Sequence, residues 1–442
     1  MTSSLHHIST FFDSYEERED AFRRAVAFKL ARRYAGPSVF WQDFSGISRG
    51  DTGAQEADYV AYIPSNPRDC LAFGTPRQVL MAGLMSAGKS GAGDTTAVMD
   101  TACGFEIQDL LSQPIRTLSG GETVKLALAK TSVGLGDCSR VVVASPFTWL
   151  SQANRHLLET IVTQAREKQK PISILALTGE GDLNPIDETD PFLKPSPVMI
   201  PFTLNLSQVR IPLSVSLHPL AREAAHASIE NRSMALSSPC LIVGDNGQGK
   251  SLLARAMAHA ISFKGDVKIE SPGSQRPPCL LFQDVLAQTI LRTFPALTGV
   301  MGGKQKERTR KCYADIQQHY TAAVDHTTGA ALPYIGDYDN RMHSLLDTKT
   351  ILVAARLSAR PAALILDEPD WGMSRESAIA FVSAVLSTAH HQKTPVLLIS
   401  HKPWWQSVTR SSIRVSRTTG KDGDTSSAPV FTIHLAREEE LI

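Results

Sequence analysis

The stretch GDNGQGKS, Gly244 to Ser251, matches the pattern G-x-x-x-x-G-K-[ST], in which backbone N–H groups and a lysine surround phosphate. A second match, GLMSAGKS, runs from Gly83 to Ser90. The pattern alone is insufficient, because such a loop also needs a buried strand leading in and a helix leading out. The strand holds the loop, and the helix N-terminus directs N–H groups at the anion. The surroundings therefore decide between one phosphate site and two.

Only the later match has both neighbours. The apolar run Pro239–Val243 predicts a strand, and Ser251–Ala260 is rich in helix formers. The earlier match follows the helix-like RQVLMAG and precedes the glycine-rich GAGDTTA, so we expect Lys89 to lie on a surface loop. The predicted phosphate-contacting residues are Gly244, Asp245, Asn246, Gly247, Gln248, Gly249, Lys250 and Ser251.

Composition narrows the class of protein. The 442 residues suffice for two or three domains, and 42% apolar with 20% charged residues is ordinary for a globular chain. A net charge of +1 gives no electrostatic reason to expect nucleic acid as a partner. Six scattered cysteines, no apolar run of about 20 residues and no signal peptide predict a cytoplasmic protein that is not itself transmembrane.

Three predicted strands downstream of Lys250 end in polar residues. The run Ala362–Leu366 leads into Asp367 and Glu368. An aspartate there can hold Mg²⁺ through water, and the adjacent glutamate can orient an attacking water. The other two strands are Cys279–Phe282, which precedes Gln283, and Pro395–Ser400, which precedes His401. Together and in this order, these residues indicate a nucleotide-hydrolysing site.

A further motif lies in the first half of the chain. The sequence LSGGE, from Leu118 to Glu122, opens a predicted helix that a short loop connects to the strand Arg140–Val143. The chain thereby resembles the ATP-binding-cassette (ABC) ATPases. In that family this signature meets the γ-phosphate held by the other domain of a head-to-tail pair. The resemblance implies nucleotide contacts from Leu118, Ser119, Gly120, Gly121 and Glu122.

The positions of these motifs predict two cassettes in tandem. About two dozen residues before Asp367, where the second half needs its own signature, HSLLD carries Leu345 and Leu346 in place of both glycines. Their side chains block close backbone approach. In the first half, Ala144-Ser145 replaces the Asp-Glu pair. By sequence alignment Ser65 corresponds to Gln283 and Gly179 to His401; these are the other two replacements in the first half.

The phosphate loop of the first half is also lost. Between the predicted strand Leu5–Phe12 and the predicted helix Ala21–Leu30 lies DSYEERED, Asp13 to Asp20, with five acidic residues that would repel phosphate. In a head-to-tail pair, each site combines the phosphate loop of one half with the signature of the other half. The site that would use the first half's loop has lost every motif, whereas the site that uses the second half's loop keeps all of them. We predict one nucleotide site, formed by the second half's loops and the first half's signature.

The resulting fold class is α/β, with two tandem ABC-type P-loop domains packed head to tail. Each is expected to have a mainly parallel core sheet and a helical subdomain. The predicted boundaries are 1–185 for the degenerate domain, 186–197 for a Pro- and Asp-rich linker, and 198–442 for the intact domain.

The resemblance also implies a role for each site residue, with ATP and Mg²⁺ as ligands. Lys250 would contact the β- and γ-phosphates, and Ser251, Gln283 and Asp367 would hold the metal. Glu368 would polarise the attacking water, and His401 would touch the γ-phosphate. The chain has no Phe, Tyr or Trp between Phe202 and Phe263, where family members usually stack adenine.

Three classes of function remain open from the sequence. The stretch YIPSNPRDCLAFGTP, Tyr62 to Pro76, resembles part of the energy-coupling-factor importer ATPases. It favours the energising subunit of an importer, with integral-membrane transporter subunits as partners and a place on the inner face of the membrane. The alternatives are a soluble ABC-type ATPase that remodels a protein or nucleic-acid complex, and a nucleotide-gated structural dimer in which hydrolysis is incidental.

Overall fold

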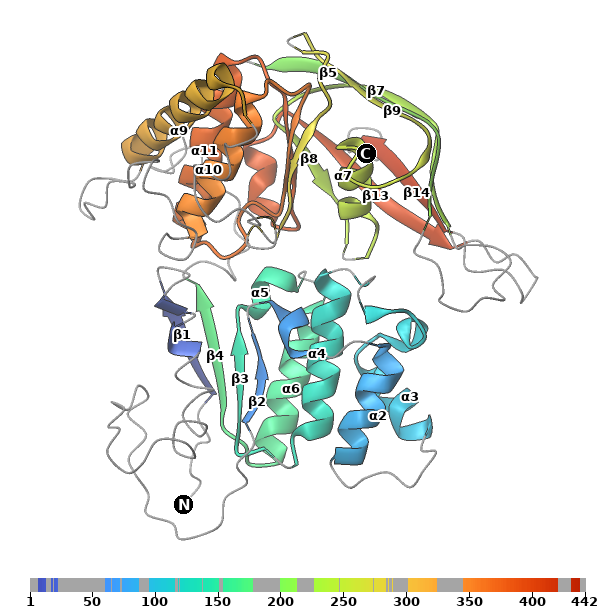
Figure 1. The fold of residues 1–442 in the computed structure, drawn as a ribbon. Helices are drawn as coiled ribbons and strands as arrows, with labels where there is room; N and C mark the ends of the chain where they lie inside the picture. Colours follow the sequence, from blue (N-terminus) through green and yellow to red (C-terminus); the bar gives the residue numbers. More distant parts are fainter. Residues whose placement is uncertain are drawn as a thin grey trace. The chain divides into compact units, whose positions relative to one another are not determined.

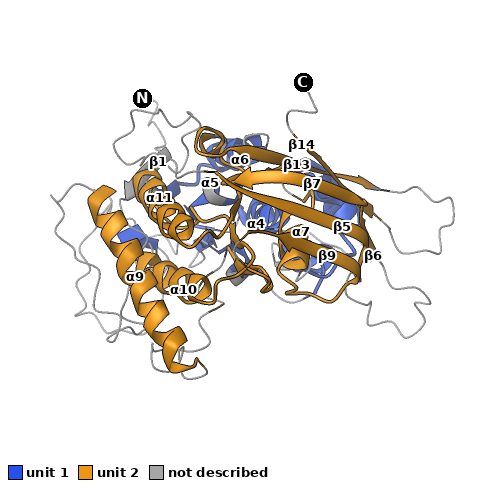
Figure 2. Ribbon diagram, turned by 90° about the horizontal axis from the view of Figure 1, so that it is seen from above, with its two compact units in different colours: residues 1–181 blue, residues 182–442 orange. Residues whose placement is uncertain are grey.

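The computed structural model (Figure 1) describes residues 7–12, 17–18, 20–22, 60–64, 66–71, 74–86, 95–115, 118, 120–136, 138–150, 154–177, 199–212, 226–245, 247–272, 274–283, 285, 288, 301–323, 345–419 and 431–437. The chain divides into two compact units, residues 1–181 and residues 182–442 (Figure 2). The predicted linker 186–197 lies outside the described residues, and the predicted domain boundaries stay predictions.

Unit 1 has a parallel sheet in the order β1-β4-β3-β2. Helix α4 packs against α2, α3, α6 and strand β2. The elements are β1 (His7–Phe12), β2 (Val60–Ile63), η1 (Pro67–Cys70), α2 (Pro76–Ser86), α3 (Thr95–Gly104), η2 (Gln108–Leu110), α4 (Gly120–Gly134), β3 (Arg140–Ala144), α5 (Pro146–Trp149), α6 (His156–Glu167) and β4 (Ile172–Leu177).

Unit 2 has one larger sheet, in the order β10-β11-β12-β8-β13-β14-β6-β5-β7, with β9 also paired to β5. Helices α9, α10 and α11 pack together. The elements are β5 (Ile200–Pro212), β6 (His226–Ile229), β7 (Arg232–Ser238), β8 (Cys240–Val243), α7 (Lys250–Met257), β9 (Lys264–Glu270), β10 (Cys279–Leu281), α9 (Gly303–Ala323), α10 (Leu345–Ser358), β11 (Leu364–Asp367), α11 (Arg375–His391), β12 (Val396–Ile399), η8 (Pro403–Ser407), β13 (Ser411–Thr419) and β14 (Phe431–Arg437).

The two units repeat the same four-stranded core. The order β1-β4-β3-β2 of unit 1 recurs as β8-β12-β11-β10 in unit 2, and every pair in both sets is parallel. The chain also visits the strands in the same sequence in both units. The fold is therefore two α/β domains in tandem, as the sequence predicted, and the shared core allows the two units to be compared position by position.

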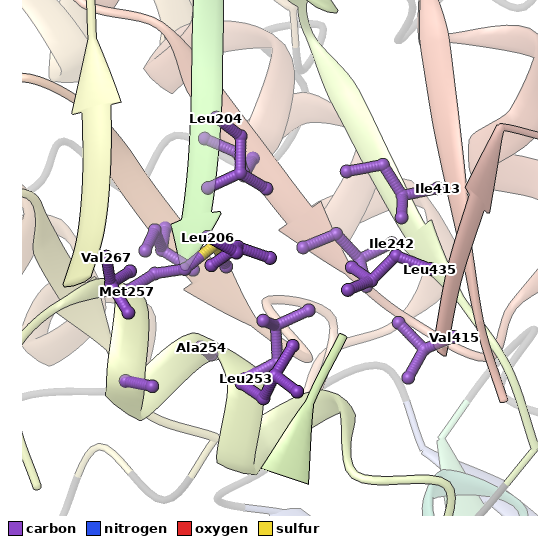
Figure 3. Packing of buried hydrophobic residues seen from close by; sticks show 14 of the residues in the cluster. Leu204, Leu206, Ile242, Leu253, Ala254, Met257, Val267, Ile413, Val415 and Leu435 are labelled. Carbon is purple, nitrogen blue, oxygen red and sulfur yellow. The ribbon is translucent and has the colours of Figure 1, made fainter. Parts of the chain in front are cut away.

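The core of unit 2 holds helix α7 against the sheet. Leu253, Ala254 and Met257 of α7 are fully buried, and they lie among Leu206, Val267, Ile242 and Val415 from four different strands (Figure 3). Burial of aliphatic side chains contributes about 25 cal/mol per Å² of apolar surface removed from water. The loop between β8 and α7 is thus fixed at both ends by the same apolar cluster.

Candidate functional site

The loop from Gly244 to Gly249 is a close-packed glycine turn. Gly244, Gly247 and Gly249 all have positive φ, at 152°, 82° and 97°. A Cβ on Gly244 would meet the carbonyl oxygen of Val415, and one on Gly249 would lie 2.6 Å from Ile433 Cδ1. Glycine is required here because other residues would be both strained and blocked. The turn places helix α7, which begins at Lys250, directly after the loop.

Lys250 is folded over this turn. Its Nζ donates to the carbonyl oxygens of Gly244 (2.6 Å) and Asp245 (3.1 Å). Burial lowers the pKa of Lys250, although Glu368 and Asp367 act in the opposite direction. The lysine is thus a buried cation close to the ends of β8 and β11, as a phosphate ligand requires.

Asp367 stands at the end of β11 beside Ser251 of α7. The Ser251 hydroxyl donates to Asp367 Oδ1 over 3.3 Å. Burial raises the pKa of Asp367 to about 7, and neighbouring Glu368 adds to the increase. A buried carboxylate beside a hydroxyl supplies the hard oxygen ligands that Mg²⁺ prefers. Gln283 is half-buried two residues after β10, the strand that pairs with β11.

Glu368 is held in an uncommon backbone conformation. It has φ 47°, and its N–H donates to the carbonyl oxygen of Ile399 over 2.8 Å. Its Oε1 lies 3.1 Å from His401 Nδ1. Burial by itself raises the pKa of Glu368, but His401, Lys250 and Lys402 outweigh burial and hold that pKa below its usual value. The carboxylate is therefore kept ionised in a buried position.

Two atoms of this pair are left for a ligand. Glu368 Oε2 and His401 Nε2 are buried and have no hydrogen-bond partner among the described residues. Buried polar atoms are normally satisfied, so orphaned ones commonly mark a ligand or water position. Together with the glycine turn, Lys250 and the Ser251–Asp367 pair, they fit a magnesium nucleotide.

Strand β13 supports the loop from the other side. The backbone N–H of Arg417 donates to Gln248 Oε1 over 2.6 Å. The Arg417 guanidinium lies 3.8 Å from the centroid of the Phe431 ring, and its Nη1 is 3.5 Å from Gly247 O. The side chain of Gln248 is therefore engaged with β13.

The predicted signature residues lie in unit 1. Gly120, Gly121 and Glu122 form the first turn of α4, whereas Ser119 lies outside the described residues, as does Asn246 of the phosphate loop. Leu118 is 1% exposed, and its carbonyl oxygen accepts a 2.7 Å hydrogen bond from Arg68. Its side chain therefore packs in the core of unit 1. Whether these residues join those of unit 2 in one site stays a prediction.

The earlier match to the phosphate pattern is in a different setting. Gly83, Leu84, Met85 and Ser86 belong to helix α2, and the remaining four residues, Lys89 among them, lie outside the described residues. A phosphate loop follows a strand and precedes a helix. This match begins within a helix instead. The expected surface position of Lys89 stays a prediction.

Unit 1 retains the backbone conformation of the turn at Glu368 without its carboxylate. Ser145 has φ 46°, and its N–H donates to Leu175 O over 2.7 Å. Glu368 makes the same contact with Ile399. A proline follows in both cases. Ser145 is therefore the structural counterpart of Glu368.

The pairing of strands identifies a residue that sequence reasoning missed. Leu175 pairs with Thr10 in β1, and Ile399 pairs with Ile242 in β8. Eight residues after these two partners stand Arg18 and Lys250. Arg18 is 0% exposed, and its Nη1 donates to the Ser145 hydroxyl. The acidic segment thus carries a buried cation in the position of the phosphate-loop lysine.

The same register corrects one alignment from the sequence. Leu177, and not Gly179, stands two residues after Leu175 and so corresponds to His401. β4 and β12 begin at equivalent positions, Ile172 and Val396, but β4 continues two residues beyond the counterpart of Ile399, to Leu177. On the other side, Ile63 and Leu281 are counterparts, which leaves Ser65 opposite Gln283 as predicted; Ser65 itself lies outside the described residues.

No family model and no curated protein sequence matches the chain. Solved structures do. One titled "Model of ribosome-bound archaeal Pelota and ABCE1" covers 86% of this chain and 65% of that chain, with a TM-score of 0.52 and 12% identity. The structure "RNase-L Inhibitor" covers 86% of this chain and 75% of that chain, with a TM-score of 0.45 and 12% identity.

A third structure is cbiO1 from Clostridium perfringens, whose title describes it as part of the ABC transporter complex cbiONQ. It covers 48% of this chain and 84% of that chain, with a TM-score of 0.35 and 15% identity. At 12% identity, the match of TM-score 0.52 establishes the fold alone.

Among the described residues, no helix is both long enough and apolar enough to cross a membrane.

Substitution of Gly244 tests the geometry of the loop. Gly244→Ala adds a Cβ at φ 152° against the carbonyl oxygen of Val415. We expect the free energy of unfolding to fall by about 1–3 kcal/mol, measured by chemical denaturation. The control is Gly303→Ala, because a Cβ on Gly303 meets nothing within 4 Å. Equal stability of the two variants would contradict the described turn.

Proposed function

From a fold of two ABC domains in tandem, we propose that this chain is an ATPase with a single composite nucleotide site. The main support is the arrangement around Glu368, where a buried, ionised carboxylate lies beside His401 and near Lys250. In unit 1 the corresponding residues are Ser145, Leu177 and Arg18. Catalytic chemistry is thus confined to one of two similar frameworks.

The residues of unit 2 divide the work of phosphoryl transfer to water. The N–H groups of the glycine turn and Lys250 bind the phosphates, as at other helix N-termini. Mg²⁺, held by Ser251, Gln283 and, through water, Asp367, would neutralise phosphate charge. Glu368, whose pKa is held low, is ionised at neutral pH and accepts hydrogen bonds from water. His401 orients Glu368 through their 3.1 Å contact.

Unit 1 contributes its signature helix to the same nucleotide. Gly120 and Gly121 open α4, and their lack of side chains leaves its first N–H groups accessible to an anion. Leu345 and Leu346 stand at the corresponding place in unit 2, where α10 begins at Leu345. Of the starts of α4 and α10, only that of α4 has glycines that leave its N–H groups open to phosphate, and α4 lies in the unit that lacks a phosphate loop.

For the partner, we propose integral-membrane transporter subunits that dock on the segment Tyr62 to Pro76. Within it η1 is tied to α4 and to Leu118, two residues before α4 begins. Arg68 Nη2 donates to Leu118 O over 2.7 Å, and Lys130 Nζ donates to Cys70 O over 2.6 Å. A partner bound to η1 would act directly on the start of the signature helix, which gives a mechanical route between nucleotide and partner.

A soluble remodelling ATPase is the alternative. The structure with TM-score 0.52 is titled as ribosome-bound ABCE1 with Pelota. That title describes the other protein, and it suggests the ribosome as the complex on which a remodelling ATPase of this fold would act. Purification of the tagged chain from detergent-solubilised cells distinguishes the two. We expect polytopic membrane subunits to accompany it, in amounts that Arg68→Ala reduces. Recovery with ribosomal or other soluble complexes, and with no membrane protein, would favour the alternative.

Glu368→Gln separates binding from hydrolysis. The variant should bind one Mg-ATP per chain by calorimetry, since only one phosphate loop is intact. It should hydrolyse ATP at least about 100-fold more slowly, the usual scale for a positioned base. Lys89→Ala, in the earlier pattern match, should leave both measurements unchanged. Two ATP sites of similar affinity would refute the asymmetric site, and turnover near wild type would place the base elsewhere.

Paired substitutions in the two helix starts test the composite site. Gly121→Asp puts a carboxylate where α4 would meet the γ-phosphate, so ATP should still bind at Lys250 but hydrolysis should be lost. Leu346→Asp is the matched change in α10, whose start has no phosphate to contact, and it should leave hydrolysis nearly unchanged. Circular dichroism establishes that both variants are folded. Equal damage from the two would rule out a single composite site.

A further inference from the structure

Helix α10 inserts a buried lysine beneath the catalytic turn. Lys349 is 0% exposed, and its Nζ donates to the carbonyl oxygens of Pro369 (2.6 Å) and Trp371. These carbonyls belong to the turn that directly follows Glu368. One ammonium group thus holds both ends of the three-residue segment Pro369–Trp371.

Asp370, at the centre of this segment, is bound from the opposite side. It is 7% exposed, and its Oδ1 accepts from the Ser400 hydroxyl over 3.3 Å. The same hydroxyl accepts from the N–H of Lys402 over 3.1 Å. Ser400 and Lys402 are the neighbours of His401 along the chain, so the network links the turn after Glu368, which Lys349 of α10 binds, to the segment that carries His401.

The network is absent from the described part of unit 1 that corresponds to it. Asp370 stands two residues after Glu368, and Phe147 stands two residues after Ser145. Lys349 stands five residues after Ser344, as Val124 stands five residues after Ser119 in the signature of unit 1. Counted back instead from the last residues of β11 and β3, Lys349 corresponds to Leu126. Both counterparts are apolar and buried. The buried charges therefore occur in the unit that retains Glu368.

Packing of α10 does not require a lysine. Burial lowers the pKa of Lys349 to about 7, with Asp370 opposing the change, which reflects the cost of placing an ammonium group away from water. Unit 1 packs its corresponding helix with an aliphatic side chain and avoids that cost. The lysine is accordingly explained by its hydrogen bonds to the turn Pro369–Trp371 and not by the packing of α10.

We propose that Lys349 is a positioning residue for ATP hydrolysis, which fixes the turn Pro369–Trp371 and thereby the direction of the Glu368 carboxylate. The proposal rests on the ATPase function proposed above. Glu368 has φ 47°, and rotation of the turn that follows it would move the carboxylate away from His401. Helix α10, which lacks the glycines of a phosphate-binding start, thus supports the catalytic group of its own unit.

Lys349→Met tests this assignment, because it keeps the length and apolar stem of the side chain and removes the donors. We expect kcat of ATP hydrolysis to fall about 10- to 100-fold, the scale of a misplaced catalytic group, with the affinity for Mg-ATP changed less than about threefold. Asp370→Asn, an isosteric change on the other side of the turn, should lower kcat in the same way. The double variant should lose less than the product of the single losses, because both act on one turn.

The matched control is Thr350→Val on the same helix. Thr350 is equally buried, and its hydroxyl donates to Leu346 O within α10, so this change removes a buried polar group without touching the turn. It should leave kcat unchanged. Wild-type kcat in folded Lys349→Met or Asp370→Asn, or an equal fall in Thr350→Val, would overturn the positioning role while leaving the ATPase proposal intact. A wild-type chain without ATPase activity would overturn both.

Discussion

Three carboxylates within four residues are buried at the end of β11, and the surroundings of the candidate site are arranged around them. Asp367, Glu368 and Asp370 are 3%, 8% and 7% exposed. Buried like charges so close together are unfavourable unless each has a partner. Asp367 accepts a hydrogen bond from Ser251 and is near the positive charge of Lys250. Glu368 contacts His401. Asp370 accepts a hydrogen bond from Ser400 and is near the positive charges of Lys402 and Lys349. These partners come from α7, α10 and the segment after β12, which is why the site draws on so much of unit 2.

Unit 1 has the same backbone conformation at the end of β3, but the carboxylates are replaced. Ala144, Ser145 and Phe147 replace the three carboxylates, so no set of buried cations is needed. Arg18 remains as the counterpart of Lys250, and it bonds to the Ser145 hydroxyl, which stands in the place of the Glu368 carboxylate. Close to Arg18 along the chain, Ala21 and Phe22 cluster with Val142 and Ala144 of the sheet. The Arg18 side chain and a small apolar cluster thus lie in unit 1 where unit 2 has its glycine turn.

The sequence predicted the elements that depend on local patterns. The apolar runs of β8, β11 and β12, the glycine turn and the helix after LSGGE all lie where their residues indicated. It did not predict Arg18, because the five acidic residues around it indicated only a segment that repels phosphate. The pairing of β1 with β4 shows its equivalence to Lys250. The sequence also misplaced the counterpart of His401 by two residues, because the register of β4 with β3 is set by strand pairing and not by the apolar pattern. Lys349 gave no signal at all, since its partners are backbone carbonyls 20 and 22 residues away.

The left-handed conformation of Ser145 shows what unit 1 still has to preserve. A non-glycine residue at φ 46° costs about 1–3 kcal/mol, and in unit 2 the turn is justified by the direction it gives Glu368. Serine has no such task, yet the turn is kept, with Arg18 bonded to it and Pro146 starting α5 directly after it. Loss of the turn would displace α5, which packs against α4. Because α4 carries Gly120 and Gly121 at its start, the strained turn holds the start of that helix in place within unit 1.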